Sequence, residues 1–158
     1  MAYADYNFYH NTYCGNKLTQ EKAAQYLTRA SDEIDVYTFN RLANAFPEVE
    51  SHAVKVKKAV CAVADILYTV DIQRNATMVT TDENGEVKKV VASMSSGRES
   101  ISYSVNNTAA SEYAAAAADT DVLNTLIIGA VSKHLANIPD ANGVNLLYAG
   151  ARGGGYYV

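Results

Sequence analysis

One apolar stripe constrains the fold of this chain more than any other sequence feature. Between residues 49 and 70, apolar side chains recur at alternating spacings of four and three. They are Val49, Ala53, Val56, Val60, Val63, Leu67 and Val70. This spacing places them on one face of an α-helix about 30 Å long. Cys61, Ala64 and Tyr68 widen the stripe, which favours the core helix of a small bundle over a coiled coil.

Helical patterns also precede and follow this segment. Thr19 is expected to cap a helix with its hydroxyl. The apolar face that follows consists of Ala23, Leu27, Ala30 and Ile34. A short helix or turn over 38–45 is expected to end before Pro47. An Ala-rich stretch over 109–118 and an apolar face from Leu123 to Val131 predict the last helices, and Asp119 to Asp121 either caps a fresh helix or interrupts one.

The periodicity changes after Arg74. β-Branched and apolar runs over 78–81 and 87–92 flank Asn84-Gly85, and Asn-Gly is the strongest short hairpin signal. An extended segment is expected from 93 to 105. In its last part Ile101, Tyr103 and Val105 alternate with polar residues, so one side of it can be buried.

These elements predict a mainly α fold, a small helical bundle with an inserted β-hairpin and extended N- and C-terminal arms. The length of 158 residues favours a single domain. Its expected parts are an N-terminal arm (1–18) that packs on the helices, helices (19–74), the hairpin and extended segment (75–105), C-terminal helices (109–138) and a C-terminal tail (139–158).

Composition narrows the classes of function. A content of 49% hydrophobic and 19% charged residues fits a folded soluble protein. The formal net charge of −4 argues against binding to nucleic acid through a basic surface. Twelve Tyr and no Trp suit surfaces that become buried on assembly, although compositional drift explains the bias equally well. No secretion signal or membrane span is expected, and Cys14 and Cys61 are expected to be reduced thiols.

The sequence offers no convergent set of reactive groups. The three histidines, His10, His52 and His134, fall in separate segments, and only His10 and Cys14 come close to metal-ligand spacing. His134 is expected near the end of a helix, where it would interact favourably with the dipole when charged. There is no Gly-x-Ser-x-Gly, and the glycines at 153–155 lack the Lys-Ser/Thr of a phosphate loop. No catalytic, cofactor-binding or metal residue is therefore predicted, and the chain is not expected to be an enzyme.

Six short motifs follow one another along almost the whole chain. They are Tyr3-x-x-Tyr6 with Phe8-Tyr9, Leu27–Asp35 (Leu-Thr-Arg-Ala-Ser-Asp-Glu-Ile-Asp), Phe39-Asn40-Arg41, the Val-x-x-Ala pattern of Val56–Ala64, Ser95–Tyr103 and Gly143–Gly150. In this order they resemble the head–tail connector (adaptor) proteins of tailed bacteriophages of Gram-positive hosts. The segment 77–92 is longer than in that family, and the tail runs past the usual ending.

The resemblance implies a structural subunit of the virion neck. Such subunits form a ring, usually of twelve copies, between the portal protein and a stopper or tail-completion protein. DNA passes through the channel without sequence-specific binding, and no cofactor or membrane is involved. The expected location is the virion, and the host cytoplasm during assembly. The alternative is a small helical DNA-associated or regulatory protein, which would have to rely on Lys55, Lys57 and Lys58.

The expected contacts with the portal or a neighbouring subunit lie in two segments. They are Leu146, Leu147, Tyr148, Arg152, Tyr156 and Tyr157 in the tail, and Ile101 and Tyr103 in the extended segment. The tail from Leu146 to Val158 is expected to be disordered in the free subunit and to become ordered on the portal.

Overall fold

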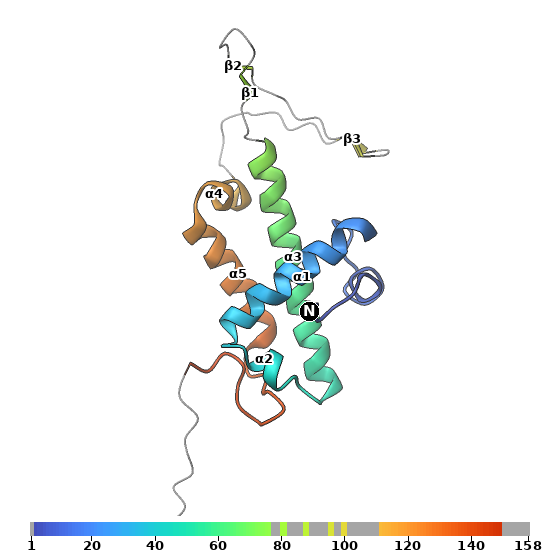
Figure 1. The fold of residues 1–158 in the computed structure, drawn as a ribbon, viewed down its shortest axis with the longest axis vertical. Helices are drawn as coiled ribbons and strands as arrows, with labels where there is room; N and C mark the ends of the chain where they lie inside the picture. The colour runs from blue at the N-terminus through green and yellow to red at the C-terminus, as the bar shows by residue number, and fades with distance from the viewer. Residues whose placement is uncertain are drawn as a thin grey trace, which may run out of the picture. The chain divides into compact units, whose positions relative to one another are not determined.

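The computed structural model describes residues 2–76, 80–81, 87–88, 95–96, 99–100 and 111–149. Its helices are the π-helix η1 (Phe8–Thr12), α1 (Gln20–Tyr37), α2 (Arg41–Asn44), α3 (Glu50–Ala76), α4 (Glu112–Ala118) and α5 (Thr120–Leu135) (Figure 1). This part of the chain is mainly helical, as predicted. None of its helices combines the length and the apolar character needed to cross a membrane.

Short strand pairs lie between α3 and α4 in the sequence. β1 (Thr80–Thr81) pairs antiparallel with β2 (Val87–Lys88), and β3 (Ser95–Ser96) pairs antiparallel with β4 (Glu99–Ser100). The Asn84-Gly85 turn and most of the segment 93–105 lie outside the described residues. The inserted hairpin therefore stays a prediction.

The residue contacts divide the chain into two compact units. Unit 1 comprises Met1–Asp65 and Ile127–Val158, and unit 2 comprises Ile66–Leu126. Among the described residues of unit 2, the side chains of Ile66, Leu67, Val70, Ala116 and Leu123 are apolar and buried. Arg74 Nε donates a hydrogen bond of 3.2 Å to the Ala117 carbonyl, which ties the end of α3 to the end of α4.

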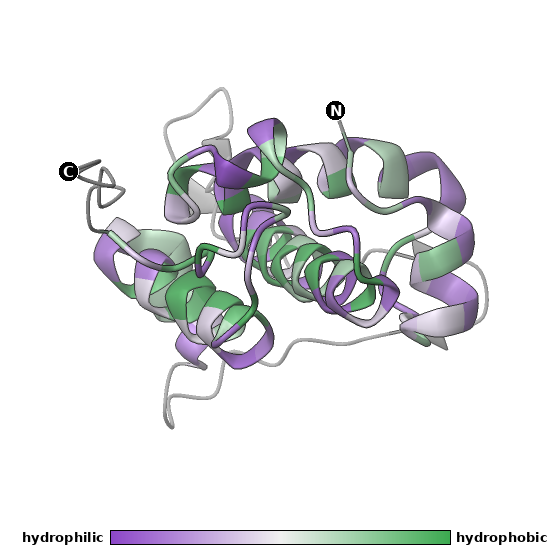
Figure 2. Ribbon diagram, turned by 90° about the horizontal axis from the view of Figure 1, so that it is seen from below, coloured by the Kyte–Doolittle hydropathy of each residue, from purple (hydrophilic) through white to green (hydrophobic). Residues whose placement is uncertain are grey.

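The two apolar stripes of unit 1 are buried as predicted. Ala23, Leu27, Ala30 and Ile34 of α1 are all buried, and so are Val56, Val60 and Val63 of α3. Figure 2 shows that the helices combine hydrophobic and hydrophilic residues, as expected of amphipathic elements. Val49 was wrongly placed in the stripe. It precedes α3, contributes only its carbonyl to the first turn, and leaves its side chain 54% exposed.

Helix caps differ in part from the predicted ones. Thr19 is the residue before α1, but its side chain makes no capping hydrogen bond. The predicted hydroxyl cap is therefore wrong, and only the Thr19 carbonyl takes part, accepting from the N–H of Ala23 at 2.9 Å. Asp119 both ends α4 and supports the start of α5, because its Oδ1 accepts from the Asp121 N–H at 2.8 Å. The interruption at this point is thus a break between two helices.

The N-terminal segment packs on the helices of unit 1, as predicted, but it is not an extended arm. The Tyr3 N–H donates to Ser31 Oγ at 3.0 Å, and its hydroxyl donates to Asp35 Oδ1 at 2.7 Å. The Tyr3 ring also stacks on Phe46, with 5.5 Å between ring centroids. Further along, η1 coils the chain, and its Tyr9 and His10 rings stack on Tyr6 at 6.4 and 5.7 Å. The prediction of an extended arm is therefore wrong at η1.

Tyr9 anchors this segment to α3. Its side chain is fully buried, and its hydroxyl donates to Asp65 Oδ1 at 2.6 Å. The Tyr9 hydroxyl oxygen also accepts hydrogen bonds from the backbone N–H groups of Lys17 and Leu18, at 3.1 and 3.2 Å. The chain therefore wraps around one phenol ring and closes on it. Gly15 lies against that ring, so closely that a Cβ atom there would be 2.2 Å from Tyr9 Cζ.

Alkaline pH is expected to destabilise the fold through Tyr3 and Tyr9. Burial, and then the hydrogen bond to a carboxylate, raises the pKa of each phenol above its ordinary value of 10.0. Stability from these phenols is therefore fully present below pH 10 and is lost as the pH rises through the raised pKa values. Chemical denaturation between pH 8 and 11 tests this. The Tyr9→Phe chain should be less stable at pH 8 but should lose less stability on going to pH 11.

Candidate interaction surface

The junction between α1 and α2 has an unusual backbone. Thr38 closes α1 with its hydroxyl donating to the Ile34 carbonyl at 2.9 Å. The next two residues, Phe39 and Asn40, then have φ values of 55° and 57°. Left-handed conformations cost non-glycine residues roughly 1–2 kcal/mol each. The strained turn directs Phe39 outward, where its side chain is 54% exposed.

The segment after α5 forms a tight, ordered loop. Pro139 and Asn145 make an antiparallel bridge. Between them, Asp140 Oδ1 accepts from the N–H groups of Asn142 and Val144 at 2.8 and 2.9 Å. The turn needs glycine at position 143, where φ is 78°. These bonds give the loop a fixed conformation without a helix or an extended strand.

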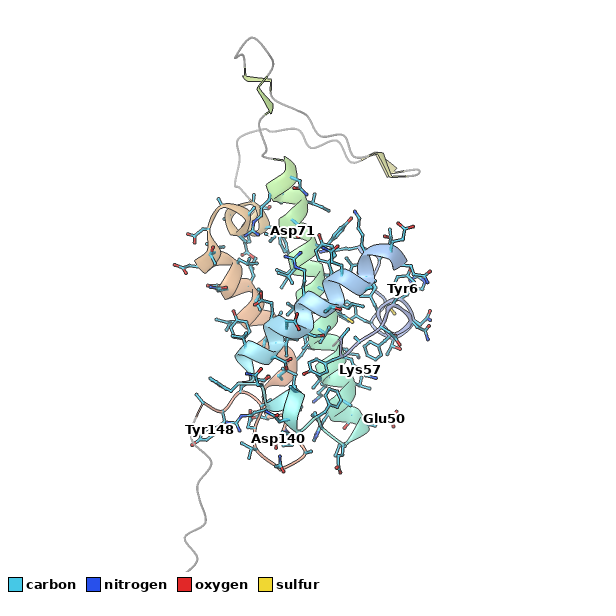
Figure 3. All side chains as sticks on the ribbon, in the orientation of Figure 1. Tyr6, Glu50, Lys57, Asp71, Asp140 and Tyr148 are labelled. Atoms are coloured by element: carbon cyan, nitrogen blue, oxygen red, sulfur yellow. The ribbon has the colours of Figure 1, made fainter. Side chains whose placement is uncertain are left out.

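This loop docks on α2 within unit 1. The Ala141 N–H donates to the Ala45 carbonyl at 3.1 Å, and Arg41 Nη2 donates to the Tyr148 carbonyl at 2.7 Å. Figure 3 shows Asp140 and Tyr148 at the same end of this unit, close to α2. Residues more than a hundred positions apart therefore build one face.

We call this face the Phe39 surface. It consists of an exposed aromatic side chain, Phe39 (54%), an adjoining hollow, and the exposed Tyr148 (55%), whose carbonyl bonds to Arg41 in the wall of the hollow. The hollow, of about 300 Å³, is lined by Phe39, Arg41, Asn44, Ala45, Asp140 and Asn142. It contains an aromatic ring and a guanidinium group, and both Phe and Arg are enriched at protein interfaces. A second open hollow is lined by Thr19, Gln20 and Glu21, and none of these three is aromatic.

The predicted contact residues of the tail separate into three kinds. Leu146 is fully buried, and its N–H donates to the Ile138 carbonyl at 2.9 Å, so its side chain belongs to the core of unit 1. Leu147 is half-buried, and Tyr148 is exposed on the Phe39 surface. The prediction that the free subunit is disordered from Leu146 onward is wrong for Leu146 to Tyr148. Arg152, Tyr156, Tyr157, Ile101 and Tyr103 lie outside the described residues.

No family model, curated protein or solved structure matches this chain. Its function is therefore inferred from the Phe39 surface and from the sequence. Sequence reasoning noted Phe39-Asn40-Arg41 as a motif but did not place Phe39 at a candidate surface. The available signal was Asn40, because asparagine tolerates the left-handed conformation and stands here between two helical patterns.

The described residues contain no cluster of side chains that could bind a metal ion. No group of three or more His, Cys, Asp or Glu side chains there could hold a metal ion. The weak His10 and Cys14 pair serves other contacts, since the His10 ring stacks on Tyr6 at 5.7 Å and the Cys14 thiol faces the Asn11 carbonyl at 3.9 Å.

His134 lies in the last turn of α5, where its surroundings oppose the charged form. Burial lowers the pKa of this imidazole below its ordinary value of 6.5, and the positive charges of Lys133 and Lys58 lower it further. Desolvation and two ammonium groups therefore oppose the charged form, in which His134 would interact with the helix dipole.

The two cysteines are expected to differ sharply in reactivity. Cys14 is exposed, whereas Cys61 is buried. Burial, followed by the Asp65 charge, raises the pKa of the Cys61 thiol to about 12. Because the thiolate is the reacting species, Ellman's reagent should modify Cys14 quickly and Cys61 only after unfolding. A Cys14→Ser chain should have no fast-reacting thiol; equal rates for both thiols would contradict the burial of Cys61.

Proposed function

We propose that this chain is a structural head–tail connector subunit of a tailed bacteriophage, forming a ring that docks on the portal and lets DNA pass. One observation carries the proposal: two of the motifs behind the family resemblance build the same surface. Phe39-Asn40-Arg41 forms the α1–α2 junction, and Gly143–Gly150 reaches it through Tyr148. The bond from Arg41 to Tyr148 joins residues 107 positions apart.

This arrangement supports assembly as the role of the surface. Phe39 is held outward by a strained backbone, and such strain persists where the surrounding structure and a function require it. An exposed aromatic side chain beside a hollow is the kind of anchor that dominates protein interfaces. In a closed ring each subunit presents one face to a different face of its neighbour, and the Phe39 surface would supply one of these two faces.

The finer features of the proposal follow from the sequence. The inserted hairpin and the extended segment 93–105 would reach a neighbouring subunit. The C-terminal tail would reach the portal. A stopper or tail-completion protein would bind the opposite end of the ring. The net charge of −4 suits a channel that DNA slides through, because acidic walls repel phosphates. The subunit would occupy the virion neck, and the host cytoplasm before assembly.

Native mass spectrometry of the purified chain, alone and with its cognate portal, tests the proposal. The expected result is a symmetric set of copies on the portal. Phe39→Ser should weaken this association at least tenfold, whereas Val49→Ser should leave it unchanged. Val49 is a matched control because it is also 54% exposed in unit 1 but does not line the hollow.

Two outcomes would contradict the connector proposal. One is no association with the portal at any concentration tested. The other is a monomer that shifts duplex DNA, which would favour the DNA-associated alternative and its lysines on α3. One of these, Lys57, has its Nζ 5.5 Å from the centroid of the Phe8 ring, so it is already engaged within the subunit.

A further inference from the structure

The last two turns of α1 carry negative charge that the described residues do not neutralise. Asp32 is exposed and Glu33 is half-buried. Neither side chain forms an ion pair with a residue that the structure describes, and the last turn of α1 has no basic side chain. Carboxylates near a helix C-terminus are unfavourable, because the final carbonyl groups carry partial negative charge. Both carboxylates therefore remain available to a partner.

An exposed apolar side chain accompanies these carboxylates. Val36 follows Asp32 by four residues, so both lie on one face of α1, and Val36 is 68% exposed. The Phe39 N–H donates to the Val36 carbonyl at 3.2 Å, so this face leads directly into the turn that carries Phe39. We call Asp32, Glu33 and Val36 the acidic end of α1.

Lysines gather on another part of unit 1. Lys55 is exposed and Lys58 is half-buried, and their spacing of three places both on one face of α3. Lys133 is exposed in the last turn of α5. Besides burial, the positive charges of Lys133 and Lys58 lower the pKa of His134, so α3 and α5 bring both lysines close to one imidazole. We call Lys55, Lys58 and Lys133 the basic patch.

The basic patch differs from the other cations of unit 1 and unit 2. None of its three lysines forms an ion pair or a hydrogen bond with a residue that the structure describes. The other lysine and arginine side chains that it describes all make contacts within the subunit; they are Lys17, Lys22, Arg29, Arg41, Lys57 and Arg74. Positive charges that gather without a carboxylate repel one another, so the basic patch favours an anionic partner.

We propose that the basic patch is the second face of the ring contact and receives the acidic end of α1 from a neighbouring copy. The inference rests on the connector function proposed above and names the face that meets the Phe39 end of the next subunit. A heterologous contact needs two different, complementary faces on one chain, and unit 1 carries both. Opposite charges across such a contact fix its register and disfavour wrong pairings.

A second copy fits the basic patch better than DNA does. Proteins that hold duplex DNA neutralise many phosphates, whereas three lysines stand here in a chain with a formal net charge of −4. The acidic end of α1 offers two carboxylates, which is a closer match in charge. Each copy therefore supplies the group that its neighbour requires.

An exchange of charge between two variants tests this contact without a portal. One variant is Lys58→Glu/Lys133→Glu, and the other is Asp32→Lys/Glu33→Lys. Each alone should self-associate at least tenfold more weakly than the unsubstituted chain in sedimentation equilibrium, because like charges would then face each other. An equimolar mixture should recover the association, since the reversed patch of one variant meets the reversed α1 end of the other.

The control for net charge is Glu21→Lys/Glu112→Lys. It changes the charge as much as Asp32→Lys/Glu33→Lys does, at exposed side chains in the first turns of α1 and α4. This variant should self-associate like the unsubstituted chain. Raising the ionic strength from about 0.05 to about 0.5 M should weaken the association of the unsubstituted chain, because salt screens exposed charges.

Carbodiimide cross-linking gives a readout that does not depend on how the variants fold. The reagent joins a lysine to a carboxylate in direct contact, and a mixture of unlabelled and ¹⁵N-labelled unsubstituted chains identifies links between copies. These links should join the basic patch to the acidic end of α1.

Three results would overturn the inference. They are a mixture that associates no better than either variant, an unsubstituted chain that stays monomeric without such cross-links, and a loss of duplex-DNA binding confined to the lysine variant, which would assign the patch to phosphate. A chain that stays monomeric yet joins the portal as a symmetric set of copies would overturn this inference alone and leave the connector proposal standing.

Discussion

Gly15→Ala is expected to lower the free energy of unfolding by about 3 kcal/mol. The added Cβ would lie 2.2, 2.4 and 2.6 Å from three atoms of the Tyr9 ring. Carbon atoms that are not bonded do not approach so closely, so either the ring or the loop has to move. Urea denaturation followed by circular dichroism measures the loss.

The ring has little freedom to yield. Tyr9 is fully buried, and its hydroxyl is held by Asp65 and by the backbone N–H groups of Lys17 and Leu18. Moving the ring would break these bonds, and moving the loop would leave the same donors unpaired. Burying an unpaired polar group costs about 1–3 kcal/mol, which is why the overpacking is not relieved cheaply.

Gly129→Ala is the matched control. Its added Cβ meets nothing within 4 Å, and the residue lies inside α5, where alanine is favoured over glycine. This substitution should stabilise the chain by about 0.5–1 kcal/mol. If Gly15→Ala proved equally harmless, the Tyr9 ring could not be seated against Gly15. Combining Gly15→Ala with Tyr9→Leu should cost less than the sum of the two, because the clash would be partly removed.

The helices of this chain were predictable because their signal is local. The stripe from Val56 to Val70 repeats at helical spacing, and its members are buried. The packing of Tyr9 was not predictable in this way. Its partner Asp65 is 56 residues away, and no local pattern marks which of twelve tyrosines will be buried. Gly15 was correctly assigned to a turn, but the reason glycine is needed there lies in the tertiary contact.

The candidate surface was predicted only at Tyr148. The apolar run Leu146-Leu147-Tyr148 was interpreted as one contact segment, yet its members face different surroundings. Phe39 was missed because exposure of an aromatic residue depends on the backbone angles of the turn that carries it. Those angles follow from how α1 ends at Thr38 and from the loop that docks on α2. Sequence periodicity carries no information on either.

Leu146→Ala is expected to cost about 2–5 kcal/mol of unfolding free energy, as is typical for a buried leucine. The side chain is fully buried, and its backbone is fixed by the bond to the Ile138 carbonyl. Truncation would therefore leave a cavity that the Pro139–Asn145 bridge prevents from collapsing. Leu147→Ala, one residue further along and half-buried, should cost much less.

Measuring both stability and portal association separates the structural role of this segment from its proposed role at the portal. Leu146→Ala should lower the stability. Any loss of portal association should disappear when the variant and the unsubstituted chain are compared at equal concentrations of folded protein. Tyr148→Ala should weaken portal association but leave the stability nearly unchanged, because its exposed ring contributes to the surface and little to the core. A Leu146→Ala chain as stable as the unsubstituted one, yet unable to join the portal, would return Leu146 to the interface. In that case the tail would begin at Leu146, and the buried position found here would be wrong.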